Sequence, residues 1–256
     1  MTRPVVIAVS HLTKSIIVER YGIRAGKVTV AHNGIEWAGP EPPPRRPHRT
    51  RVVLFLGRIT MQKGPEFFLR TAAYVLARMD HVKFIVAGWG DMGPHLVELA
   101  ANMGLGRKVF FTGFLRGKQV ESAFRHADVY IMPSVSEPFG LTALEAVRYG
   151  VPVIISRNSG AAEVLLRGAL KVDFWDVYDT ADKVLAVLNN PTLADELRRH
   201  AAAEVRRLTW DKTARRCVHV YAQLLAERSG IDIPSLPEPG APGSGAAPGA
   251  GVRTII

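Results

Sequence analysis

Cysteine is nearly absent from this sequence, and its scarcity limits both the compartment and the chemistry. Cys217 is the one cysteine among 256 residues, so no disulfide can form within the chain. A chain without disulfides suits a reducing compartment, and we expect a cytoplasmic protein. The short apolar run near the N-terminus is not followed by a small-residue cleavage site, which argues against a secretory signal.

Long hydrophobic runs are also missing. The longest runs, such as residues 52–56, have the length of a strand and fall well short of the roughly 20 residues that a bilayer span requires. No transmembrane helix is therefore expected. Hydrophobic residue types still make up 47% of the chain, which is enough to form the core of one large domain.

The usual short motifs for metal binding do not occur. The sequence has no Asp-x-Asp, no Cys-x-x-Cys and no histidine pair at helical spacing. We therefore expect no divalent-ion site for a diphosphate, no bound metal and no cofactor. His11, His32 and His126 are isolated in the sequence, and we expect structural or surface roles for all three.

Basic residues outnumber acidic ones, and the formal net charge is +10. One basic patch lies in the proline-rich residues 42–51, which we interpret as a surface loop. The other patch covers residues 198–216 and is interleaved with acids, which is typical of a solvated helical face. Peripheral contact with an anionic membrane surface, or an anionic substrate, is the alternative. No recognition-helix pattern or aromatic ladder is present, so no nucleic-acid partner is expected.

Strand-like and helix-like segments alternate through most of the chain. Strands are expected at residues 4–9, 51–57, 82–88, 108–113, 128–134 and 151–156, and helices at 11–20, 65–79, 92–104, 117–127 and 139–150. The Val/Ile/Phe-rich runs from residue 51 onward are typical of strands buried on both faces. Short connections between parallel strands require right-handed crossovers. We therefore predict an α/β fold, a Rossmann-like doubly wound parallel sheet with helices on both faces.

Beyond Lys171 the pattern becomes mainly helical. In the last predicted helix, residues 210–227, apolar side chains recur at helical spacing and include Cys217, which we therefore assign to the core. From residue 229 to residue 256 the composition changes to proline, glycine, alanine and serine. Such a stretch buries too little apolar surface to offset its ordering entropy, so we predict a disordered tail over 229–256.

The loop after the strand at residues 51–57 has features of a phosphate site. It carries Gly57, Arg58, Lys63 and Gly64 just before a helix that is expected to start at Pro65. Glycines allow backbone N–H groups to approach an anion, and the two cations can neutralise a diphosphate. The alternative is a tight strand-to-helix turn with two solvated cations.

Two later loops also follow predicted strands. Gly88 and Gly90 lie in "AGWGDM", where they permit close backbone approach or a positive φ, although a plain turn explains them equally well. Gly113 and Phe114 lie in "TGFL", a loop suited to holding a flat ring. Ligands of open parallel sheets bind at the carboxyl ends of the strands, which is where these loops are expected.

The most informative stretch is "SEPFGLTALEAVRYG", residues 136–150. It places Glu137 in a loop and Glu145 a little over one turn inside the following helix. Two carboxylates in one crevice could hold the hydroxyl groups of a hexose and a ribose. Alternatively, Glu137 complements the helix dipole and Glu145 is an ordinary solvated residue.

Taken together, "LGRITMQKG", "VAGWGDM", "FTGFL" and "SEPFGLTALEA" resemble the donor-binding half of the retaining GT-B glycosyltransferases of the glycosyltransferase-4 and glycogen-synthase type. Two glutamates separated by seven residues are the hallmark of that family, and Glu137 and Glu145 match it. The resemblance covers about residues 4–227. The stretches "VSHLTKSIIVERYGI" and "VAHNGIEW" look like the link between the family's two Rossmann-like domains.

The resemblance implies a role for each matching residue. Arg58 and Lys63 would bind the donor's diphosphate and stabilise the departing nucleotide, while Glu137 would contact the donor sugar. Glu145 would hold the ribose. The remaining donor-binding positions are the backbone of Gly57 and Gly88, Gly113 and Phe114 at the base, and Phe139, Gly140 and Leu141 near the sugar and phosphate. Ser159 stands in place of the first glycine of a loop that more often reads Gly-Gly in the family.

The resemblance also implies a domain plan and a function. Residues 1–50 would be an interdomain segment, and residues 51–228 the Rossmann-like donor-binding domain with its C-terminal helices. The activity implied is hexosyl transfer from a UDP-, ADP- or GDP-sugar to an acceptor, with retention of configuration. The family's N-terminal acceptor domain has no counterpart in this sequence, so we expect either a truncated chain or a separate acceptor-domain chain as its partner. A non-catalytic nucleotide-sugar-binding module and a GT-B-fold epimerase are the alternatives.

Overall fold

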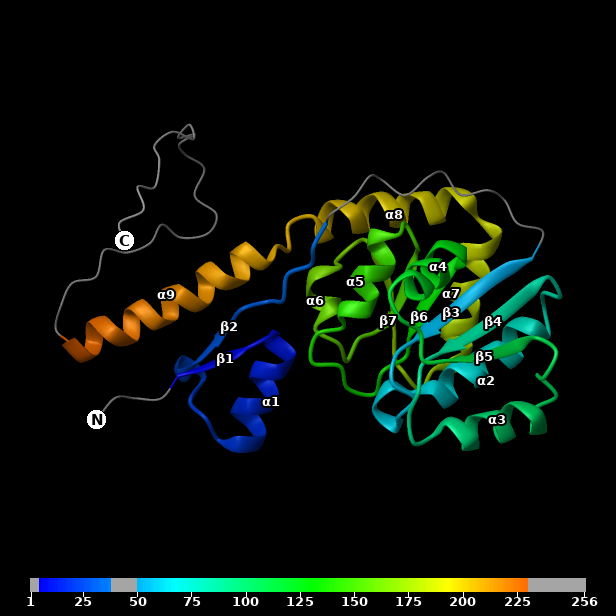
Figure 1. Cartoon of the computed structure of the whole chain (residues 1–256), viewed down its shortest axis with the longest axis horizontal. Coiled ribbons are helices and arrows are strands. Elements are labelled where there is room, and N and C mark those ends of the chain that lie inside the picture. The colour runs from blue at the N-terminus through cyan, green and yellow to red at the C-terminus, as the bar shows by residue number, and fades with distance from the viewer. Residues whose placement is uncertain (1–4, 38–49, 230–256) are drawn as a thin grey trace, which may run out of the picture.

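The computed structural model describes residues 5–37 and 50–229, and a six-stranded parallel sheet forms its centre (Figure 1). The strands are β3 (Arg51–Leu56), β4 (Val82–Ala87), β5 (Val109–Gly113), β6 (Val129–Met132), β7 (Val153–Ser156) and β8 (Ala169–Val172). Their order across the sheet is β5-β4-β3-β6-β7-β8, and every neighbouring pair is parallel. The strand order reverses between β3 and β6, which is where ligands of doubly wound sheets bind.

The central strands are buried on both faces, as their continuous apolar sequences predict. All four residues of β6 and all four of β7 are buried. Alternate side chains of each strand point to opposite faces, so Val53 and Leu54 of β3 belong to two different core clusters. The predicted α/β fold is confirmed.

Helices cover both faces of the sheet. One core cluster takes its buried residues from α2 (Pro65–Leu76), α3 (Gly93–Asn102) and α7 (Val177–Asn189). The other takes them from α4 (Lys118–His126), α5 (Leu141–Arg148) and α6 (Ala161–Val164). In Figure 1, α2 and α3 accordingly lie across the sheet from α4 and α5. Helix α8 (Pro191–Val205) joins the clusters, because Ala194 packs in the first and Val205 in the second.

Residues 5–37 form a small separate unit. Strands β1 (Val6–Ala8) and β2 (Val28–Val30) pair in parallel as a two-stranded sheet, joined by α1 (His11–Tyr21) and the short 3-10 helix η1 (Ala25–Lys27). The Ile35 amide donates to the Leu208 carbonyl (3.0 Å), which ties this N-terminal unit to the main domain. Gly34 is required here, because a Cβ atom would lie 2.1 Å from the Trp210 nitrogen.

Two strands were not predicted. β8 has only four residues and partly exposed central positions, so it lacks the continuous apolar run that revealed the other strands. β2 has three residues, and it is recognisable only through its pairing with β1.

The assignment of Cys217 to the core is wrong. Helix α9 (Trp210–Ser229) extends away from the main sheet, as Figure 1 shows, and Cys217 is only half-buried. Tyr221 in the same apolar stripe is 57% exposed, whereas Val220 is buried. Helical periodicity predicts an apolar stripe, but it does not say whether another element lies against that stripe.

The proposed basic loop at residues 42–51 and the predicted disordered tail at 229–256 lie almost entirely outside the described residues. Within residues 5–37 and 50–229, no helix has both the length and the apolar character needed to cross a membrane.

Candidate functional site

A cavity of about 290 Å³ opens at the carboxyl ends of β3 and β6, where the strand order reverses. Its floor is formed by apolar and aromatic side chains of the strands, including Phe55, Tyr130 and Met132. The predicted site residues that line it are Gly57, Arg58, Lys63, Gly88, Phe114 and Glu137. The fold therefore brings together residues from four loops that the sequence separates by up to 80 positions.

The loop after β3 is shaped by glycine. It contains the short 3-10 helix η2 (Met61–Lys63), and it ends at Gly64, which has a left-handed φ of 65°. A Cβ atom on Gly64 would lie 2.0 Å from the Pro133 carbonyl oxygen in the loop after β6. The close approach of these two loops places Lys63 against the residues that follow β6.

Lys63 forms an ion pair with Glu137. Its Nζ donates to Glu137 Oε2, and the lysine side chain is 19% exposed. The Ser134 hydroxyl also donates to Glu137 Oε2 (3.4 Å). Arg58 is exposed at the cavity, with Nη2 3.5 Å from Gln62 Oε1. The cavity thus combines two cations with one buried carboxylate.

The backbone of Glu137 is held by the loop that leads into α6. The Glu137 amide donates to the Asn158 carbonyl (2.9 Å), and the Gly160 amide donates to the Glu137 carbonyl (3.1 Å). Ser159 forms an isolated parallel bridge with Glu137, and its hydroxyl donates to the Ser156 carbonyl (2.7 Å). The loop with the unusual serine therefore positions the first glutamate.

Gly88 is the second place where glycine is required. Its φ is 148°, and a Cβ atom would lie 1.8 Å from the Gly57 carbonyl oxygen. The expectation of close backbone approach at Gly88 is confirmed. This contact brings the loop after β4 to the cavity, and the neighbouring residue Trp89 lines it.

Aromatic side chains stand at the cavity mouth. Trp89 is 74% exposed and Phe114 is 63% exposed, and both line the cavity. The Arg116 guanidinium lies 5.2 Å from the centre of the Phe114 ring. Exposed aromatic faces beside a cavity can stack on a flat ring of a ligand. Trp89 was not among the residues predicted from the sequence, where only the glycines of its loop pointed to a ligand site.

Five predicted site residues do not line the cavity: Gly113, Phe139, Gly140, Leu141 and Glu145. Phe139 is buried, and its carbonyl already accepts a hydrogen bond from the Ala161 amide. Glu145 lies on α5 one turn beyond Thr142, and Thr142 does line the cavity.

The environment of Glu145 is nevertheless linked to the cavity through Tyr130. The Tyr130 hydroxyl donates to Thr142 Oγ1 (2.8 Å). Burial raises the pKa of Tyr130, and the charges of Glu137 and Glu145 raise it further, while the Thr142 hydrogen bond lowers it. Burial also raises the pKa of the Glu145 carboxyl, with Arg148 opposing that change. Both glutamates therefore act electrostatically on the same buried phenol.

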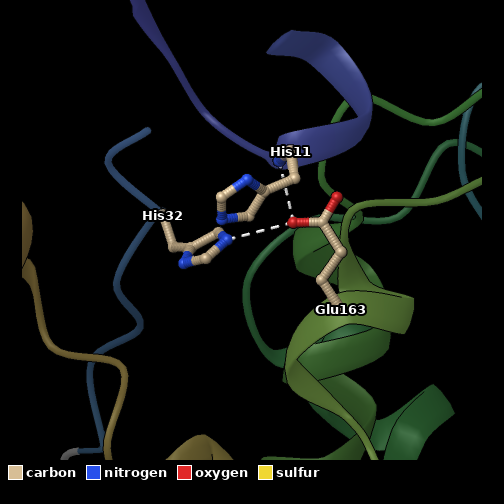
Figure 2. Close-up of side chains that lie close together, drawn as sticks. All are labelled: His11, His32 and Glu163. Carbon is tan, nitrogen blue, oxygen red and sulfur yellow. Dashed lines mark hydrogen bonds and ion pairs between the residues drawn. The ribbon is translucent and has the colours of Figure 1, made fainter. Parts of the chain in front are cut away.

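A second cluster brings together two of the histidines that are isolated in the sequence. The fold brings both rings to Glu163 of α6, as Figure 2 shows, and possible metal-ligating atoms of the three residues lie within 4.8 Å of one another. His126 is exposed on α4 with Nδ1 2.7 Å from the Ser122 carbonyl oxygen, so its predicted surface position is confirmed. Sequence spacing gave no sign of the cluster, because its members are 21 and 131 residues apart.

Known proteins that are similar to this chain in sequence include two glycosyltransferases. An uncharacterized glycosyltransferase of Methanocaldococcus jannaschii is 34% identical over 67% of this chain and 44% of its own length. A D-inositol 3-phosphate glycosyltransferase of Acidothermus cellulolyticus is 33% identical over 83% of this chain and 51% of its own length. The chain thus spans about half the length of these relatives.

A solved structure shares the fold. The structure of Anabaena HepE in complex with UDP and glucose superimposes with a TM-score of 0.73 at 19% identity, over 85% of this chain and 62% of that one. The family model for glycosyl transferases group 1 matches residues 41–224, which is most of the described main domain. The residues that line the cavity lie within this matched region. The chain therefore belongs to the group 1 glycosyltransferases, with a GT-B-type fold.

Proposed function

We propose that this chain is the donor-binding half of a retaining glycosyltransferase that takes a hexose from a nucleotide diphosphate sugar. One observation carries the proposal: Lys63 and Glu137 meet in the cavity where the strand order reverses, with Arg58 on the same wall. Cations suit the diphosphate of such a donor, and a carboxylate suits its sugar hydroxyls.

In the proposed reaction, negative charge develops on the departing diphosphate while positive charge develops on the sugar. Arg58 and Lys63 are the cations of the cavity, and they stabilise the leaving group where its charge appears. Donor binding shares Lys63 between the diphosphate and Glu137. The carboxylate is then free to accept hydrogen bonds from the sugar.

The rest of the donor follows the elements around the cavity. We place the ribose toward the first turns of α5, where Glu145 follows Thr142 by three residues. We place the base against Phe114, whose ring is largely exposed at the mouth. UDP-, ADP- and GDP-sugars all fit this scheme, and the UDP bound to Anabaena HepE favours testing uridine nucleotides first.

Transfer also requires an acceptor wall opposite the donor cavity. Relatives of about twice the matched length support a second domain, on the same polypeptide or on a partner chain. Catalysis across a cleft needs both walls, because positioning and water exclusion supply much of the rate. We therefore expect this chain alone to bind donor and to transfer little.

A thermal-shift panel of UDP-, ADP- and GDP-sugars tests donor binding. One nucleotide sugar should raise the melting temperature of the wild type, and Lys63→Ala and Glu145→Ala should each lose most of that response. Lys118→Ala is the matched control, because Lys118 is exposed on α4 and does not line the cavity. No response to any member of the panel would refute the proposed site.

Retention and turnover need a second experiment. The chain is mixed with a candidate acceptor domain, nucleotide release is followed, and the anomeric configuration of the product is read by proton NMR. Release together with a product of the donor's configuration supports retaining transfer. Binding without release would favour a non-catalytic module, and conversion of the sugar without an acceptor would favour an epimerase.

A further inference from the structure

His11, His32 and Glu163 come from three different elements and meet outside the donor cavity. His11 begins α1, His32 lies just after β2, and Glu163 lies in α6 (Figure 2). We propose that these three side chains bind a divalent metal ion such as zinc at the junction between the N-terminal unit and the main domain. This ion is separate from the donor diphosphate, and its binding does not depend on the proposed transfer reaction.

The spacing of the ligand atoms supports the proposal. Zinc lies about 2.0–2.2 Å from nitrogen and oxygen ligands, so two ligands of a tetrahedral site are about 3.4 Å apart. His32 Nε2 already lies 3.1 Å from Glu163 Oε2. The three ligand atoms all lie within 4.8 Å of one another, so a movement of side chains is enough to bring them to the distances of a metal site. His11 is the exposed member and has the room to make it.

The carboxylate is held in place by the backbone of α1. Glu163 Oε2 accepts from the His11 amide (2.8 Å), and Oε1 accepts from the Leu12 amide (2.6 Å). Hydrogen bonds of this kind orient a metal ligand, and their loss typically weakens metal binding. The ion would replace the hydrogen bond between His32 and Glu163, and both atoms would turn to the metal with little change in their separation.

The ligand types point to the class of ion. Two imidazoles and one carboxylate form a donor set that zinc accepts, and three protein ligands leave a fourth position for water. The exposure of His11 gives the ion a path from solvent. The competing interpretation is a simple hydrogen bond between His32 and Glu163 with His11 as a bystander.

Metal binding here would act on the loop that carries Glu137. Glu163 belongs to the same short helix as Ala161, whose amide is hydrogen-bonded to the Phe139 carbonyl (2.5 Å). The His32 ring centre also lies 5.8 Å from that of Phe139. An ion tied to His11, His32 and Glu163 would therefore connect the N-terminal unit to the edge of the donor site.

Titration of the full chain with zinc against a chromophoric chelator tests the proposal. We expect one zinc ion per chain. When cobalt(II) replaces zinc, we expect a visible absorption spectrum typical of a four-coordinate cobalt ion. His11→Ala and His32→Gln should each weaken binding by about 100-fold or more, since loss of a ligand should cost at least as much as loss of a residue that orients one. His95→Gln is the matched control, because His95 Nε2 forms a similar pair with Glu66 Oε1 at 2.9 Å.

The outcomes separate the two interpretations. Zinc should raise the melting temperature of the wild type and of His95→Gln, but not that of His11→Ala. Absence of stoichiometric zinc binding would overturn the proposal, and so would equal binding by wild type and His11→Ala. Because His11 is exposed, His11→Ala should fold, and it decides the question even if His32→Gln does not fold.

Discussion

The Lys63 ammonium and the Glu137 carboxylate are paired in the cavity at the point where the strand order reverses. Glu137 is 7% exposed, and its carboxylate accepts hydrogen bonds from the Lys63 ammonium and the Ser134 hydroxyl. The pair joins the loop after β3 to the loop after β6. Its two members are also the ones that we assign to the diphosphate and to the sugar.

The pair should contribute to stability before any donor binds. Lys63→Met leaves a buried carboxylate without its cation, and we expect the free energy of unfolding to fall by about 1–3 kcal/mol. Adding Glu137→Gln removes the unpaired charge and should restore part of that loss. Urea denaturation measures both changes. An equal loss from Lys118→Met, at an exposed position on α4, would show that the ion pair is not the cause.

Glu145 should make stability depend on pH. Burial raises its pKa above the ordinary value of 4.5, so between the two values the folded chain binds more protons than the unfolded chain. Its contribution to stability therefore falls as the pH rises through that window and stays lowered above it. Glu145→Gln should gain stability relative to wild type at about pH 7 and much less near pH 4. Equal differences at both pH values in urea denaturation would contradict this explanation.

Gly88→Ala should disturb the donor site through the backbone. The new Cβ would lie 1.8 Å from the Gly57 carbonyl oxygen, at a φ that side chains rarely adopt. We expect a loss of about 1–3 kcal/mol in unfolding free energy and a weaker thermal shift with donor. Gly106→Ala is the control, since nothing lies within 4 Å of a Cβ there. Comparable losses in the two variants would remove the argument for close loop packing.

Phe114→Ala should weaken nucleotide binding and leave the stability of the fold almost unchanged. The side chain is 63% exposed, so the unfolding free energy should change by about 0.5 kcal/mol or less. If the base stacks on this ring, nucleotide binding should weaken by about 1–3 kcal/mol, which calorimetry with free UDP can measure. Trp175→Ala, at another exposed aromatic residue that does not line the cavity, should leave the affinity unchanged. Unchanged affinity in Phe114→Ala would place the base elsewhere.

The sequence by itself determined the sheet and its loops. Strands buried on both faces have continuous apolar runs, and for this reason β3, β4, β5, β6 and β7 could be predicted, together with the helices between them. Ligands of parallel sheets bind at the carboxyl ends of strands, so Arg58, Lys63 and Glu137 could be assigned to one crevice.

Only the tertiary structure decided which side chains meet and which remain exposed. The Lys63–Glu137 pair spans 74 positions, and the cluster of His11, His32 and Glu163 joins three elements with no fixed spacing. The apolar stripe of α9 has a clear helical period, yet most of it is not buried, because periodicity reports one face of a helix and not its neighbour. Local sequence sets the conformation of each element, while contacts between distant elements depend on how the whole chain packs.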